Sequence, residues 1–157
     1  MGQSQLELSV SDPTGQYALK VEGIDEKVQV FVLQTLMERG GRHFCRIEDK
    51  GRFGKYNYIV ITLVGKSLLD LRKSQPTNRL SLACALSVGI QCLEALEGTV
   101  LNNIKSTDLL KSDLHGIGYL HRDVKPGNYT IGRPEVNELR KIYILDFGMC
   151  RKFTNDQ

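Results

Sequence analysis

The sequence predicts an α+β fold, with antiparallel strands in most of the first half and helices after them. Up to residue 64 most apolar residues alternate with polar ones or form short runs, a pattern typical of strands. From residue 67 to residue 97 they recur at helical spacing. With 157 residues, of which 41% are hydrophobic, the chain is large enough for one domain with a core.

The first elements form a hairpin followed by a helix. Leu6, Leu8 and Val10 alternate with polar residues, residues 12–15 (DPTG) favour a turn, and a second strand runs from Tyr17 to Glu22. Apolar residues at helical spacing predict a helix over residues 25–39, and Gly40 and Gly41 end it.

Two further strands and two helices follow. Strands are predicted at Phe44–Ile47 and Tyr56–Val64, and the run YIVITLV indicates that the second is covered on both faces. A short helix is expected at Ser67–Ser74. A longer helix at 81–97 carries an apolar stripe formed by Leu82, Leu86, Ile90, Leu93 and Leu96. Near the end, Tyr129–Ile131 and Lys141–Leu145 read as short strands.

Residues 98–112 interrupt the helical pattern. Their composition favours a helix less than the preceding residues do. If these residues are left out, Leu114 falls three positions after Leu96, as the next apolar residue of one helix. We therefore expect an insertion within one helix, while an ordinary helix–loop–helix is the alternative.

Three groups of residues have the chemistry of phosphoryl transfer. They are the run HRDVKPGN at residues 121–128, the triplet DFG at 146–148, and Lys20 on the second strand. Phosphoryl transfer depends mainly on positioning and on neutralising charge. Asp123 can accept the proton of the attacking hydroxyl, and Asn128 and Asp146 offer the oxygen ligands that Mg²⁺ prefers.

Basic residues complete this set. Lys20 can hold the α- and β-phosphates, and Lys125 can reach the phosphate being transferred. We expect Gly148 to let the backbone turn so that the Asp146 carboxylate faces the cleft. The run HRDxKPxN is a specific signal because six residue types recur at set spacing, whereas DFG alone is weak.

These residues resemble the motifs of eukaryotic protein kinases, and Lys125 resembles the serine/threonine branch. The stretches YALKVE, YNYIVITLVGKSLLDLRKSQP, GYLHRDVKPGNYTIGR and KIYILDFGMCRKF are similar to the casein kinase one group, especially its tau-tubulin kinase-like subfamily. The resemblance covers about Asp12 to Phe153. It implies a partial protein kinase domain, incomplete at both ends, that uses ATP and Mg²⁺ to phosphorylate serine or threonine of a protein substrate.

The resemblance also implies how the domain is divided. Residues 5–64 form the small lobe and residues 65–157 the start of the helical large lobe, with 98–112 as an insertion. ATP binds at the hinge between them, lined by Ala18 and by Ile61 at the gatekeeper position. The backbone of Thr62, Leu63 and Val64 would bond adenine. Arg122 would tie the catalytic loop to the activation segment.

Two departures from the family support an alternative function. The stretch before Asp12 has no GxGxxG motif to cover the phosphates, and the helix after Lys20 lacks the glutamate that pairs with the lysine. Gln29 falls nearest that position, and Glu26 could replace it if the helix shifts. The alternative is therefore a non-catalytic, pseudokinase-like protein that binds nucleotide or a partner.

Composition excludes other classes of function. A net charge of +3 is too small to indicate nucleic acid or a membrane surface as a partner, and no apolar run is long enough to cross a membrane. The first residues do not resemble a secretory signal. The four cysteines have no CxxC spacing, so we expect free thiols, no disulfide partner, and a location in the cytoplasm and also in the nucleus.

Overall fold

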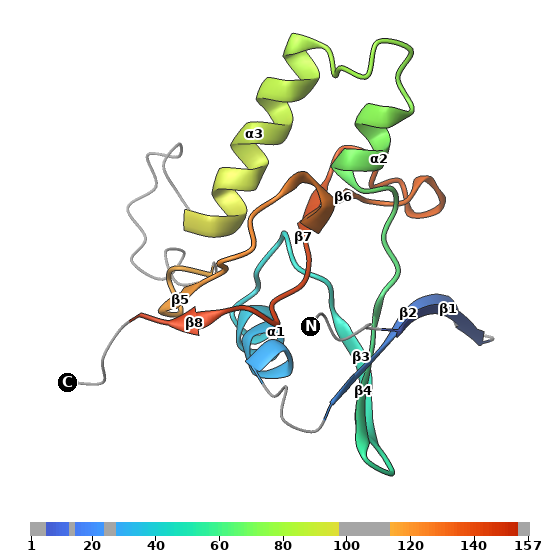
Figure 1. The fold of residues 1–157 in the computed structure, drawn as a ribbon, viewed down its shortest axis with the longest axis vertical. Helices are drawn as coiled ribbons and strands as arrows, with labels where there is room; N and C mark the ends of the chain where they lie inside the picture. Colours follow the sequence, from blue (N-terminus) through green and yellow to red (C-terminus); the bar gives the residue numbers. More distant parts are fainter. Residues whose placement is uncertain (1–5, 13–14, 24–27, 98–113, 154–157) are drawn as a thin grey trace.

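The computed structural model of the chain describes residues 6–12, 15–23, 28–97 and 114–153. A four-stranded sheet with one helix beside it forms one part (Figure 1). The other part contains two helices, two short two-stranded sheets and one isolated β-bridge. The α+β class predicted from the sequence is confirmed. No helix among the described residues is long and apolar enough to cross a membrane.

The sheet is antiparallel throughout. Its strands are β1 (Leu6–Asp12), β2 (Gly15–Gly23), β3 (Ile47–Phe53) and β4 (Tyr56–Thr62), in the spatial order β1-β2-β4-β3. The predicted hairpin is formed by β1 and β2, and its turn residues 13–14 lie outside the described residues. In β2, Lys20 is paired with Ile59 of β4 and Ala18 with Ile61. Because β2 also pairs with β1, both residues lie on an inner strand of the sheet.

The strand predicted at Phe44–Ile47 is wrong, because β3 begins only at Ile47. Residues 43–46 instead cross between β7 and β4: the His43 carbonyl accepts from Ile144, and the Arg46 carbonyl accepts from Thr62. β3 was missed because it is an edge strand whose polar residues are mostly exposed, so it shows no apolar alternation.

Strand β4 also differs from the expectation. It ends at Thr62 rather than Val64, and within it only Ile59 is buried while most other residues are half-buried. The apolar run therefore predicted the strand correctly, but the prediction that both faces of this strand are buried is wrong.

Helix α1 (Val28–Glu38) packs its apolar face into the core through Val32, Leu33 and Leu36. The expected glycine stop is confirmed. Gly40 has a φ of 74°, its N–H donates to Met37, and the Gly41 N–H donates to Leu36, which is the Schellman arrangement. Residues 25–27 of the predicted helix lie outside the described residues.

Two helices form the upper part of the molecule in Figure 1. Helix α2 (Leu68–Lys73) is capped by Ser67, whose side chain accepts from the Asp70 N–H. Helix α3 (Leu82–Glu97) begins after Ser81, whose hydroxyl accepts from the Cys84 N–H. Its Val88, Cys92, Ala95 and Leu96 pack into the core, whereas Leu82, Leu86, Ile90 and Leu93 of the predicted stripe are exposed.

The remaining strands are short. β6 (Tyr129–Ile131) pairs with β7 (Ile142–Ile144), close to the predicted positions. β5 (Tyr119–Leu120) pairs with β8 (Arg151–Lys152); these were not predicted, because two residues are too few to show a periodicity. Single-turn helices at Pro126–Asn128 and Pro134–Val136 complete this part.

Residue His115 contacts the end of α3. The His115 N–H donates to the Leu96 carbonyl at 3.1 Å, and the Leu114 side chain is fully buried. Gly118 has a φ of 82°, and Gly118 and Tyr119 donate to His115 and Leu114 in a second Schellman arrangement. The predicted insertion itself lies outside the described residues.

Candidate nucleotide-binding and catalytic site

A cavity of about 320 Å³ lies between the sheet and the helical part. The six residues predicted to contact ATP all line it: Ala18, Lys20, Ile61, Thr62, Leu63 and Val64. Asp146 lines it as well. This volume is within the range of small-molecule and cofactor sites.

The connection between the two parts borders this cavity. Thr62 at the end of β4 donates its N–H to the Arg46 carbonyl, and the Gly65 N–H donates to Ile131 of β6 at 2.8 Å. A Cβ on Gly65 would stand 2.9 Å from the Gly132 carbonyl oxygen, so a larger residue would push β6 away. The segment is therefore held at both ends, with Leu63 and Val64 between them.

Lys20 is buried and contacts two polar side chains. Its Nζ donates to Gln29 Oε1 at 2.7 Å and to Asp146 Oδ1 at 3.2 Å. Gln29 on α1 is 2% exposed, so this hydrogen bond is shielded from water. The sequence pointed to Gln29 as the residue nearest this lysine, and the structure places it there. The other candidate, Glu26, lies outside the described residues.

Asp146 carries the backbone turn that directs its carboxylate. Its φ is 62°, a left-handed conformation that is uncommon outside glycine. The expectation that Gly148 makes this turn is wrong, because Gly148 is not among the glycines with positive φ. The following residue, Phe147, is 1% exposed, and the centroid of its ring lies 5.9 Å from that of Phe44 and 5.3 Å from that of His121. This packing of the Phe147 ring holds the neighbouring Asp146 in place.

His121 joins the two sequence motifs. Its Nε2 lies 2.9 Å from the Leu145 carbonyl, and its Nδ1 accepts from the Asp123 N–H at 3.2 Å. A nitrogen that accepts a hydrogen bond carries no proton, so the ring is neutral with its proton on Nε2. Burial lowers the pKa of His121 below its usual 6.5, in agreement with this arrangement.

Asp123 is held by two neighbours in the run 121–128. Its Oδ2 accepts from Lys125 Nζ at 2.6 Å and from Asn128 Nδ2 at 2.9 Å. Hydrogen bonding to Lys125 is the largest influence on the Asp123 carboxyl and lowers its pKa. Asp123 is therefore ionised at neutral pH and can accept a proton.

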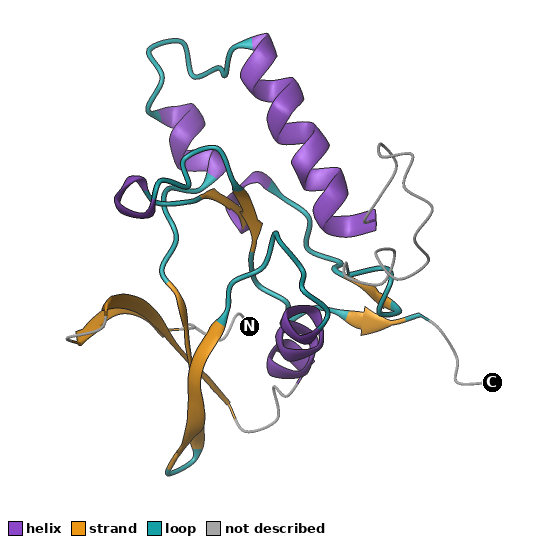
Figure 2. Ribbon diagram, turned by 180° about the vertical axis from the view of Figure 1, so that it is seen from behind, coloured by secondary structure: helices purple, strands orange, loops and turns teal. Residues whose placement is uncertain are grey.

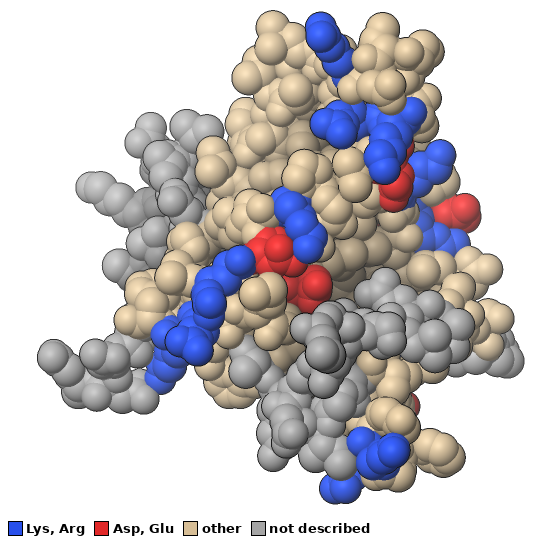
Figure 3. Space-filling model, viewed as in Figure 1, with Lys and Arg blue, Asp and Glu red and all other residues tan. Residues whose placement is uncertain are grey.

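The two motifs lie side by side. The Leu145 N–H donates to the Asn128 carbonyl at 2.8 Å, at the end of the β6–β7 pairing. Asn128 directly precedes β6 and Asp146 follows the adjacent β7, and Asp123 is bonded to Asn128. Figure 3 shows carboxylates bordered by basic groups near the centre of this face. Arg122 is exposed, with a φ of 67°.

Other residues at the cavity were not found from the sequence. Ser67, Asp70 and Thr130 also line it. None belongs to a motif, and each is brought there by the bridge between Ser67 and Thr130, which connects the start of α2 to β6. A sequence pattern does not reveal such a bridge.

The donor set fits a hard divalent cation. The Asp146 carboxylate is about one-third exposed at the cavity, and the buried Asn128 amide lies directly before the adjacent strand β6. Both offer oxygen, the atom that Mg²⁺ prefers. Among the described residues no group of three or more His, Cys, Asp or Glu side chains is placed to hold a metal, so Asp146 and Asn128 would bind Mg²⁺ only together with the phosphates of a nucleotide.

Comparisons with known proteins point in the same direction. No protein-family model matches the chain. It is 35% identical over 142 residues to a probable serine/threonine-protein kinase of Dictyostelium discoideum, and 36% identical over 146 residues to serine/threonine-protein kinase spe-6 of Caenorhabditis elegans. It is 31% identical over 139 residues to a putative casein kinase I of C. elegans.

These matches cover 88%, 90% and 88% of the chain but only 25%, 34% and 36% of the three relatives. The chain thus spans about a quarter to a third of their length. With such homologues, an antiparallel sheet followed by helices is a partial protein kinase-like fold.

Proposed function

We propose that the chain carries the nucleotide-binding and catalytic residues of an ATP-dependent protein serine/threonine kinase. The observation that supports this most is the convergence of Lys20, Asp146 and the hinge residues on one cavity, with Asp123 connected to it through Asn128. Within the kinases, the quoted sequence stretches favour the casein kinase one group and its tau-tubulin kinase-like subfamily.

The chemistry follows from the residues. A serine or threonine hydroxyl of the substrate attacks the γ-phosphorus of ATP, its proton passes to Asp123, and the bond to the oxygen of ADP breaks. Lys125 keeps Asp123 ionised and would reach the phosphate being transferred. Lys20 holds the α- and β-phosphates. Mg²⁺ held by Asp146 and Asn128 would neutralise phosphate charge.

The assay is transfer of ³²P from Mg-ATP to a pool of peptides that contain serine or threonine. Asp123→Asn should remove transfer, because the amide cannot accept the proton. Glu48→Gln, an exposed carboxyl change on β3, should leave it unchanged. Equal transfer by the parent and Asp123→Asn would contradict the proposal.

One observation favours a second function, a non-catalytic protein that still binds nucleotide. Lys20 bonds the neutral Gln29 at the position where kinases place a glutamate, so this contact is not an ion pair. A small misplacement of a phosphate-binding group costs a large rate factor, roughly 100-fold for ~1 Å. Stabilisation against heat by Mg-ATP without transfer would favour this second function over the first.

A further inference from the structure

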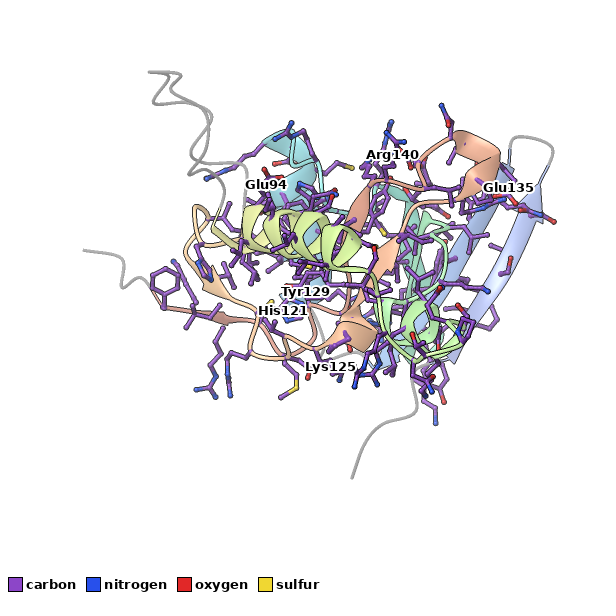
Figure 4. The ribbon with its side chains drawn as sticks, turned by 90° about the horizontal axis from the view of Figure 1, so that it is seen from above. Glu94, His121, Lys125, Tyr129, Glu135 and Arg140 are labelled. Atoms are coloured by element: carbon purple, nitrogen blue, oxygen red, sulfur yellow. The ribbon has the colours of Figure 1, made fainter. Side chains whose placement is uncertain are left out.

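A second groove, of about 660 Å³, is larger than the nucleotide cavity. The segment after α1, helix α3 and the loop between β6 and β7 form its walls, and Thr62 is shared with the nucleotide cavity. Figure 4 shows Glu94 and Arg140, which line the groove, on the side of the molecule opposite Lys125. Figure 2 shows from behind the backbone of the segments that carry these residues. A ligand there would not contact the catalytic loop.

The acidic groups of this groove are already paired with cations or donors. Glu94 Oε2 lies 3.4 Å from His43 Nε2, whose other ring nitrogen lies 2.8 Å from the Ile142 carbonyl. Glu138 accepts from Lys141 Nζ at 3.1 Å and from the Tyr143 hydroxyl at 2.6 Å. The carboxylate of Glu138 therefore already has a cation, Lys141, as its partner.

Three arginines of the groove face solvent. Arg42, Arg46 and Arg140 are exposed and line it. Among the described residues, the carboxylate nearest the Arg46 guanidinium in an ion pair is Glu48, at 3.9 Å, and the Arg46 side chain is 77% exposed. In the described part of the chain, no carboxylate lies within 4.0 Å of the guanidinium of Arg42 or Arg140. The rim therefore carries positive charge that the described residues do not neutralise.

The arginine-bearing walls are held rigidly. The Gln91 side chain donates to the Arg140 carbonyl at 2.9 Å and accepts from the Ile142 N–H at 3.0 Å. The loop between β6 and β7 is closed by the bond from Gly132 to the Lys141 carbonyl at 2.9 Å. A Cβ on Gly132 would come within 2.4 Å of Glu138, so the loop is tightly packed. A preformed surface lowers the ordering cost of binding.

We propose that this groove docks an acidic, extended segment of a protein partner. Guanidinium groups bind carboxylates through paired hydrogen bonds, and three of them around one groove match carboxylates spaced along a peptide. A nucleic acid fits less well, because three separate guanidinium groups match spaced carboxylates better than a continuous line of phosphates. The groove does not depend on nucleotide, so docking is independent of the function proposed above.

Fluorescence anisotropy of a short labelled peptide of alternating glutamate and alanine tests the proposal. The R42E/R140E variant should weaken binding by at least about tenfold, because two attractions become repulsions. R79E, an exposed arginine in the loop before α3, is the matched control and should change binding less than about twofold. Added salt should weaken binding, and Mg-ATP should not displace the peptide.

Four results would overturn the proposal: no binding of the peptide, equal weakening by R79E, displacement by Mg-ATP, or tighter binding of a single-stranded oligonucleotide of the same charge. If R42E/R140E melts well below the parent, R42Q/R140Q takes its place. That neutral pair should still weaken binding more than R79Q, and failure to do so contradicts the docking site.

Discussion

Deleting residues 98–112 is predicted to join α3 directly to its last turn. The His115 N–H donates to the Leu96 carbonyl, which becomes a helical i to i−4 bond when these 15 residues are removed. Leu114 then lies three positions after Leu96, and both residues pack into the core. We therefore propose that residues 98–112 interrupt one helix that ends at the Gly118 turn.

The gain in stability follows from loop closure. Bringing together the ends of a loop of n residues costs about (3/2)RT ln n, which for this segment is roughly 2 kcal/mol. Removing the loop should raise the free energy of unfolding by about that amount. For a chain of this size the melting temperature should rise by roughly 4 to 8 °C.

Circular dichroism measures both the melting temperature and the helix content. The matched control deletes residues 100–112, which leaves two residues in place and turns Leu114 by about 200° around a continuous helix. Deletion of 98–112 should melt above the parent, and the control should melt below the in-phase deletion. A deletion of 98–112 that melts below the parent, or no higher than the control, would refute the continuous helix.

Three further predictions concern the candidate site. Gln29→Leu removes the acceptor from Lys20 and should lower the free energy of unfolding by about 2 kcal/mol in urea titration, whereas Gln29→Glu should keep the contact; equal losses would contradict this role. His121 has a lowered pKa, so the stability it supports is complete above pH 6.5 and is lost as the pH falls through its folded pKa. Unfolding from about pH 7 to about pH 5 should therefore depend on pH more steeply in the parent than in His121→Gln, and equal slopes would argue against a neutral buried ring. Phe147→Ala should cost about 3 to 5 kcal/mol, because the buried ring anchors Asp146; a loss below about 1 kcal/mol would mean that Phe147 does not pack as described.

Much of the site could be predicted because its motifs are local. The run from His121 to Asn128 holds Asp123 between its own neighbours, so the contacts of Lys125 and Asn128 follow from short spacings. The glycine stop after α1 was predictable for the same reason, because the chemistry of a helix end lies within a few residues.

The features that could not be predicted depend on contacts between residues far apart in the sequence. Strand β3 is defined by pairing with β4, since its own residues are polar and exposed. The turn at Asp146 was assigned to Gly148, because glycine adopts positive φ most easily. The packing of Phe147 between Phe44 and His121 instead holds a non-glycine residue in that conformation. No local pattern records that packing.

Isothermal titration of the chain with Mg-ATP tests the central claim most directly. We expect binding at one site, its loss in Lys20→Met and in Asp146→Asn, and its retention in Lys50→Met, a strand lysine that faces the same β4 residue, Ile59. If the parent releases no heat of binding, or if Lys20→Met binds as tightly as Lys50→Met, the cavity beneath the hinge is not a nucleotide site.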